Sequence, residues 1–352
     1  MERKHLARRA AALLCTAALF AASVPLSASA EEVSAGRALN SLQNGGMISV
    51  ADLEEVALDY EKVSDDFLET VADEDEISVS LLKKLAVSHS LPTQYFQRFI
   101  DDSFVFKMGS QFQYIPVDDT LPKHSYNWDN LDDWYGEKEY NVGSEARAVK
   151  VIDVSSYQGD INWKKVKADG VDYAFIRLGN RGYTEGKLNL DKKFYRNMDR
   201  AADAGVQVGV YFYSQATSTE EAREEAQFVL DALEGYSLGL PVVFDIEGAQ
   251  NSSYRTYGLS AQTNTNIVKA FCQKIENAGY DVMYYSYCKF LIEQLDMSQL
   301  QQYDLWMAQY YDVPFFPYNF KIWQYDYKGQ VDGISTPVDM NLMFLDYLPN
   351  AV

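Results

Sequence analysis

Two acidic residues follow an apolar segment in the second half of the chain. Residues 241–244 are apolar, and Asp245-Ile246-Glu247 comes directly after them. Residues two apart on a β-strand share one face, so a rise of about 3.3 Å per residue predicts a separation of about 6.6 Å along the strand. Two carboxyl groups this close compete for ionisation, which suits a general acid beside an anion. A strand end with two solvated acids is the alternative.

Two further acids occupy similar places. Asp153 ends the segment Val149-Lys150-Val151-Ile152-Asp153, and Asp339 lies in Pro337-Val338-Asp339-Met340-Asn341. Acids at the ends of three predicted strands are typical of barrel enzymes, which place catalytic groups at strand carboxyl ends. Metal binding by these oxygens is an alternative. The aromatic neighbours favour a sugar over a hydrated cation, so we expect neither a metal nor another cofactor.

Aromatic side chains gather near the same predicted strand ends. They are Tyr211, Tyr213, Tyr285, Trp306 and the run Trp323-Gln324-Tyr325. Tyr211 and Tyr213 share one face of their strand. For any one of them, ordinary core packing is the alternative, but their clustering favours a groove in which sugar rings pack on aromatic faces.

Short apolar strands alternate with helices from residue 149 onward. Strands are expected at 150–154, 173–178, 207–213, 241–246, 282–286, 305–308, 321–325 and 338–342, and helices at 190–204, 219–233 and 261–278. This order predicts a largely parallel sheet, and about 200 residues suffice for a small α/β barrel. The last three strands lack long helices between them, so we expect an irregular TIM-like barrel.

The same region resembles glycoside hydrolase family 25, the lysozymes of the Chalaropsis and Cellosyl type. The matching segments are Ile152-Asp153-Val154-Ser155, Gln158-Gly159-Asp160-Ile161-Asn162-Trp163, Gly209-Val210-Tyr211-Phe212-Tyr213, Phe244-Asp245-Ile246-Glu247, Leu305-Trp306-Met307-Ala308, Trp323-Gln324-Tyr325 and Val338-Asp339-Met340-Asn341. They occur in family order over about residues 149–345. The resemblance implies an irregular α/β barrel that hydrolyses the β-1,4 bond between N-acetylmuramic acid and N-acetylglucosamine in the glycan strands of peptidoglycan.

The resemblance also implies roles for the acids. Glu247 would protonate the leaving oxygen, Asp245 would assist the 2-acetamido group or the developing cation, and Asp153 and Asp339 would flank the sugar. Substrate-binding residues are expected at Tyr213, Tyr285, Trp306 and Gln324. Two positions depart from the family pattern, Phe212 where many members have His and Asn162 where Asp is usual.

The spacing of Asp245 and Glu247 bears on the mechanism. About 6.6 Å lies at the lower edge of the inverting range and above the range of directly retaining pairs. Substrate assistance by the acetamido group, with Asp245 holding that group, is the favoured hypothesis. Two other functions stay open, a non-catalytic cell-wall binding protein and a hydrolase of another acetamido polysaccharide.

Residues 31–102 form a helical region with an internal repeat at an offset of 29. Ile48-Ser49-Val50 recurs as Ile77-Ser78-Val79, and both copies predict a helix, a turn and a second helix, with Ser49 and Ser64 as N-caps. The shape resembles a helix-turn-helix, but its acidic surface would repel DNA. A small helical module for spacing or for protein contacts, with an unknown partner, is the better interpretation. Residues 103–145 are predicted to be a partly ordered connector, and 146–352 the catalytic barrel.

The first thirty residues predict an export signal. A basic start precedes an apolar run, and Ala28-Ser29-Ala30 supplies a small-residue cleavage site. We expect a secreted or cell-envelope protein with no stable membrane span after cleavage. The 352 residues carry 31 Lys+Arg against 51 Asp+Glu, a charge of −20 that disfavours nucleic-acid binding. We expect Cys272 and Cys288 to be buried and free.

Overall fold

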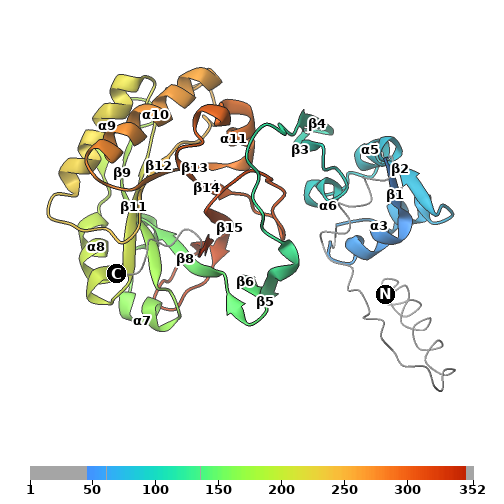
Figure 1. Cartoon of the computed structure of the whole chain (residues 1–352), viewed down its shortest axis with the longest axis horizontal. Helices are drawn as coiled ribbons and strands as arrows, with labels where there is room; N and C mark the ends of the chain where they lie inside the picture. The colour runs from blue at the N-terminus through green and yellow to red at the C-terminus, as the bar shows by residue number, and fades with distance from the viewer. Residues whose placement is uncertain (1–45, 61, 135, 346–352) are drawn as a thin grey trace. The chain divides into compact units, whose positions relative to one another are not determined.

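The computed structural model describes residues 46–60, 62–134 and 136–345 (Figure 1). The expected export signal lies outside the described residues. Among the helices that are described, none is both long enough and apolar enough to cross a membrane.

Eight strands close into a mixed barrel. In spatial order they are β8 (Ala148–Val154), β9 (Tyr173–Arg181), β11 (Gln207–Tyr213), β12 (Val242–Asp245), β13 (Val282–Tyr287), β14 (Asp304–Ala308), β15 (Ile322–Gly329) and β16 (Val338–Phe344). The first seven of these strands run parallel, and β16 runs antiparallel to both β15 and β8. The predicted irregular α/β barrel is confirmed.

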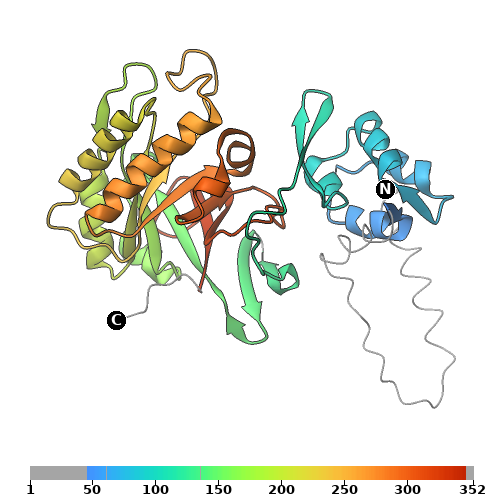
Figure 2. The ribbon, with the colours of Figure 1, turned by 45° about the horizontal axis from the view of Figure 1, so that its top comes forward.

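Helices cover the outside of the barrel. They are α7 (Trp163–Ala168), α8 (Phe194–Asp203), α9 (Thr219–Ala232), α10 (Ala261–Asn277) and α11 (Cys288–Gln294), and α9 and α10 lie side by side (Figures 1 and 2). Phe212 and Phe244 point outward, against Phe228 and Phe271 of these helices.

Helix α8 begins later than the predicted helix over 190–204. Leu190 instead ends the short strand β10 (Leu188–Leu190), which forms an antiparallel hairpin with β9. Cys272 lies in α10 and Cys288 begins α11. Both thiols are buried and free, as expected.

The barrel interior has an apolar floor and a polar layer above it. Because side chains alternate along each strand, an apolar residue is followed two positions later by a polar one on the same inward face. The floor is made by Val151, Phe175, Val243, Met283, Ile322 and Met343. Two positions further along their strands lie Asp153, Arg177, Asp245, Tyr285 and Gln324. The polar layer therefore opens at the carboxyl ends of the parallel strands.

Residues 103–146 contain five strands instead of the partly ordered connector expected from the sequence. They are β3 (Ser103–Met108) and β4 (Gln111–Pro116), which form a hairpin, and β5 (Leu131–Trp134), β6 (Glu137–Val142) and β7 (Glu145–Ala146), which form a small sheet. Tyr126 stacks on Phe344 of β16 at 3.9 Å between ring centroids. Phe104 and Tyr140 belong to the same hydrophobic cluster as the barrel helices. Aromatic packing, invisible to strand or helix periodicity, orders this segment.

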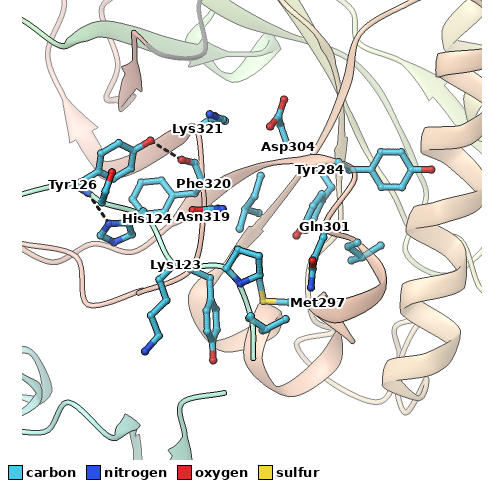
Figure 3. Close-up of a pocket in the computed structure, with 17 residues that line it drawn as sticks. Lys123, His124, Tyr126, Tyr284, Met297, Gln301, Asp304, Asn319, Phe320 and Lys321 are labelled. Carbon is cyan, nitrogen blue, oxygen red and sulfur yellow. Dashed lines mark hydrogen bonds between the residues drawn. The ribbon is translucent and has the colours of Figure 1, made fainter. Parts of the chain in front are cut away.

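Part of this segment encloses a pocket of about 240 Å³ with the barrel (Figure 3). Tyr126 donates a hydrogen bond to the carbonyl of Phe320 at 2.8 Å, and its amide donates to His124 Nδ1 at 3.1 Å. Burial lowers the pKa of His124 to about 4, so its ring is neutral at pH 7. Asp304, which also lines this pocket, begins β14. The pocket thus lies at the amino ends of the strands, opposite the end at which barrel enzymes place their active sites.

The N-terminal module has a strand at the start of each repeat. It comprises β1 (Met47–Ser49), α3 (Val50–Ala57), α4 (Asp65–Val71), β2 (Glu76–Ser78), α5 (Val79–Ser88) and α6 (Thr93–Gln97). The two strands pair antiparallel with Ile48 directly opposite Ile77. These are equivalent residues of the two copies, so the repeats are related by a local two-fold axis at this pair.

Of the two predicted helix caps in this module, one forms a capping hydrogen bond and the other does not. Ser64 accepts a hydrogen bond from the amide of Phe67, as an N-cap does. Ser49 stands at the N-cap of α3, but its side chain makes no capping bond. Its equivalent Ser78 does cap α5, through the amide of Leu81.

We predict that Tyr126 and Phe344 are energetically coupled. Phe344 is 1% exposed, so Phe344→Ala should lower the free energy of unfolding by about 3–5 kcal/mol. In a double-mutant cycle with Tyr126→Ala, denaturant unfolding should give a coupling of roughly 0.5–1.5 kcal/mol, typical of a buried aromatic pair. Trp134→Ala is the control in the same segment, because Trp134 is 67% exposed and its loss should change stability by less than ~0.5 kcal/mol. Strict additivity of the two substitutions would contradict the packing.

Candidate active site

All four predicted acids line one pocket of about 420 Å³. Asp153 is the penultimate residue of β8, Asp245 is the last residue of β12, and Glu247 follows two residues later. Asp339 is the second residue of β16, which starts at this end of the barrel because it runs antiparallel to its neighbours. Asp339 pairs directly with Asp153 across the two strands. The fold therefore gathers acids that are far apart in sequence.

The four residues expected to bind substrate line the same pocket. They are Tyr213, Tyr285, Trp306 and Gln324. Trp306 is only 2% exposed and lies beneath the pocket, in edge contact with Tyr285 at 4.9 Å between ring centroids. Tyr213, at the end of β11, is more accessible and has the ring of Tyr183 at 5.9 Å. Trp306 thus contributes mainly to the floor, and Tyr213 to the wall.

Amide side chains hold Asp153. Gln324 Nε2 and Asn341 Nδ2 each donate a hydrogen bond of 2.9 Å to the same oxygen, Asp153 Oδ2. Tyr285 and Tyr310 donate to Gln324 Oε1 at 2.8 and 2.7 Å, which fixes the orientation of that amide. Gln324 therefore positions Asp153 as well as lining the pocket.

Five other residues line the pocket, and of these only Tyr211 was among the aromatic residues singled out from the sequence. They are Arg177, Tyr183, Tyr211, Tyr287 and Tyr310. Arg177 carried a signal, because a cation inside the apolar stretch 174–178 lies on the inward face with Phe175. Its guanidinium donates to Asp191 at 2.7 and 2.9 Å. Tyr310 gave no such signal, since it follows its strand in an irregular segment.

Asp245 and Glu247 are closer together than the sequence analysis expects. Strand β12 ends at Asp245, so the extended spacing that gives about 6.6 Å does not continue to Glu247. Their carboxyl groups are instead in hydrogen-bond contact. The rise along a strand therefore does not give the distance between the two carboxyl groups, and the comparison with the inverting range has no basis in this structure.

Burial changes the proton affinity of every acid in the pocket. It raises the pKa of Asp153 to about 6, against the opposing effect of the two amide donors. Burial and the charge of Asp153 raise the pKa of Asp339 to about 8. Burial, then Glu247 and Asp153, raise the pKa of Asp245 well above its ordinary range, and burial also raises the pKa of Glu247. Because the four groups cannot all ionise, the pocket retains protons at neutral pH.

One oxygen in this pocket has no partner. Asp245 Oδ1 is buried, and none of the described residues donates a hydrogen bond to it. A buried polar atom of this kind is costly unless a ligand satisfies it. Asp245 can therefore accept an N–H from a bound molecule, while the pair that it forms with Glu247 still holds a proton.

The described residues contain no cluster of three or more His, Cys, Asp or Glu side chains with the geometry of a metal site.

Comparison with known proteins identifies the barrel. Residues 152–334, which are 183 of the 352 residues, match Glycosyl hydrolases family 25. The chain is 29% identical over 194 residues to the autolytic lysozyme of Clostridium acetobutylicum, covering 55% of each protein. It is 29% identical over 217 residues to lysozyme M1 of Streptomyces globisporus, covering 58% of this chain and 71% of the relative. The match thus spans about half the length of the autolytic lysozyme.

Solved structures share the fold. The modular autolysin LytC of Streptococcus pneumoniae superposes with a TM-score of 0.52 at 23% identity, over 70% of this chain and 57% of LytC. The spore cortex lytic enzyme SleM of Clostridium perfringens superposes with a TM-score of 0.50 at 23% identity, over 58% of this chain and 68% of SleM. The match over half of the sequence and the mixed barrel with its acidic pocket lead to one conclusion: the chain belongs to glycosyl hydrolases family 25.

Proposed function

We propose that the protein is a peptidoglycan hydrolase that cleaves the β-1,4 bond between N-acetylmuramic acid and N-acetylglucosamine. The observation that carries this proposal is the unpartnered Asp245 Oδ1 beside Glu247 in a buried acidic pocket. An acetamido N–H would satisfy that oxygen, and both sugars of the glycan have an acetamido group. The related lysozymes and autolysins support the assignment.

Binding of the acetamido group decides where the proton of the acid pair resides. In the free pocket Asp245 and Glu247 share a hydrogen bond, and their proximity keeps at least one proton on the pair. An N–H donated to Asp245 stabilises its ionised form. The proton that Asp245 holds in the free pocket then passes to Glu247, which becomes the general acid when the substrate is in place.

The favoured mechanism uses the substrate's own acetamido oxygen. Glu247 gives its proton to the glycosidic oxygen as the bond from that oxygen to C1 breaks, and the leaving sugar departs with a new hydroxyl. The acetamido carbonyl oxygen bonds to C1, while Asp245 accepts the N–H and stabilises the positive ring. Water then attacks C1, the bond from C1 to the acetamido oxygen breaks, and the water gives a proton to the Glu247 carboxylate, which restores the acid. Two inversions at C1 retain the β configuration.

We further propose that this chemistry takes place outside the cell membrane, in the envelope or in the secreted fraction. The basic and apolar composition of residues 1–30 supports this location. LytC, which has a similar barrel, has been solved in complex with a synthetic peptidoglycan ligand. Glycan strands of the wall are therefore the proposed partner of the acidic pocket.

Glu247→Gln should abolish cleavage of purified peptidoglycan. Loss of a general acid lowers the rate by at least ~100-fold. The products are reduced with borohydride and read by mass spectrometry, where reduced muramic acid ends should appear with the unchanged protein and be missing with the variant. Glu234→Gln, on an exposed loop before β12, is the matched control and should be fully active.

The same assay separates the competing functions. Binding to peptidoglycan without any new reducing end would indicate a wall-binding protein and overturn the proposal. Cleavage of a polymer of N-acetylglucosamine, with peptidoglycan left intact, would indicate a hydrolase of another acetamido polysaccharide.

The product first formed should be the β-anomer. Substrate assistance retains configuration, so proton NMR during the first turnovers should show the β signal of the new reducing end before mutarotation. An α-anomer at early times would overturn the mechanism while leaving the bond specificity in place.

Asp339→Asn should stabilise the protein at alkaline pH but not at acid pH. The folded state binds the Asp339 proton up to about pH 8, whereas the unfolded chain releases it near pH 4, so ionisation of Asp339 costs stability as the pH rises between these values. The gain in unfolding free energy should grow from near zero at about pH 4 to at least ~1 kcal/mol at about pH 8.5, since a tenfold change in proton affinity is about 1.4 kcal/mol. Denaturant unfolding measures this gain, with exposed Asp73→Asn as the control for loss of one charge. A gain independent of pH would contradict the protonation of Asp339.

A further inference from the structure

A second cavity adjoins the acidic pocket. Its volume is about 470 Å³, comparable with the acidic pocket itself. Glu247 and Tyr287 line both cavities, so the two meet at the proposed acid. The far wall of the second cavity comes from α11, which begins directly after β13.

The position of Glu247 indicates which part of a bound glycan would enter this cavity. A general acid contacts the bridging oxygen, so one sugar lies on each side of it. The sugar that is attacked needs its acetamido group at Asp245, which lines the acidic pocket but not the second cavity. The leaving sugar and the units beyond it must therefore extend past Glu247 toward α11.

Helix α11 presents a cation to this cavity. Lys289 and Glu293 are one helical turn apart and form an ion pair, with Lys289 Nζ 3.9 Å from Glu293 Oε1. Their side chains are 33% and 23% exposed. Within the described residues, Lys289 donates no hydrogen bond to an oxygen. Its ammonium is 3.2 Å from Met108 Sδ and lies over the ring of Phe106 at 5.6 Å.

These contacts hold the Lys289 ammonium in place and leave it able to bind an anion. A thioether and an aromatic face are weak partners for a cation, and the distance to Glu293 exceeds that of a hydrogen bond. Lys289 is the cation that lines the second cavity, whose other charged groups are Glu247 and Glu293. A bound carboxylate would gain a charge-assisted hydrogen bond from it.

We propose that the second cavity binds the leaving-group side of the glycan and that Lys289 recognises a carboxylate of the peptide that this side carries. The inference rests on the proposed muramidase function. The sugar next to the leaving N-acetylglucosamine is an N-acetylmuramic acid, whose lactyl group bears a peptide with free carboxylates. Glu293 orients the ammonium. Lys289 is thus a specificity-determining residue, and it takes no part in bond cleavage.

The test compares two forms of soluble, uncross-linked peptidoglycan strands. One form is native, and in the other the peptide carboxylates are converted to amides with carbodiimide and ammonia, which removes charge and keeps size. On native strands Lys289→Met should lower kcat/KM by about tenfold, because one charge-assisted hydrogen bond to the substrate is lost. On amidated strands the unchanged protein and Lys289→Met should be equally active. Lys289→Arg should keep most of the preference for native strands.

Controls separate this inference from the function on which it rests. Lys164→Met removes an exposed cation from α7 and should leave activity on both forms unchanged. An equal loss with Lys289→Met on native and amidated strands, with the circular dichroism spectrum preserved, would overturn the recognition of a carboxylate while leaving the muramidase assignment intact. Failure of the unchanged protein to cleave either form would overturn both.

Discussion

The site depends on the way a buried carboxylate is kept inside the barrel. Asp153 is 6% exposed, and an isolated carboxylate at such a position would be expelled or protonated. Asn341 from β16 and Gln324 from β15 prevent this by donating to one of its oxygens. Trp306 of β14 donates in turn to Asn341 Oδ1 at 2.8 Å. Four consecutive strands are thus tied together around one anion.

This anion sets the protonation of its neighbours. Its charge contributes to the raised pKa values of Asp245, Glu247 and Asp339, which surround it without comparable donors. Burial is the largest cause of each of these shifts, and the charge of Asp153 adds to it. Glu247 differs in another respect, because it lies beyond the end of its strand, where the two cavities meet.

Much of the barrel was predictable from the sequence, because a strand buried on both faces leaves a short apolar run and its end is marked by a polar residue. The eight strands and the inward acids follow from this rule. The start of α8 was not predictable in the same way, since Leu190 is equally compatible with a helix and with the hairpin strand that it joins. The contact of Asp245 with Glu247 was missed because it depends on the chain leaving the extended conformation after Asp245. Residues 103–146 were missed because long-range aromatic packing, and not local periodicity, orders them.

The antiparallel course of β16 has a consequence for how the protein is made. This strand closes the barrel against β8, and Asn341 reaches Asp153 across 188 residues of sequence. Closing a contact between such distant residues costs loop entropy, which slows folding in proteins rich in non-local pairings. A growing chain that lacks β16 can form the parallel strands and their helices, but its Asp153 has neither the Asn341 amide nor the facing Asp339. Synthesis from the amino terminus therefore completes the acidic pocket only when its final barrel strand has been added.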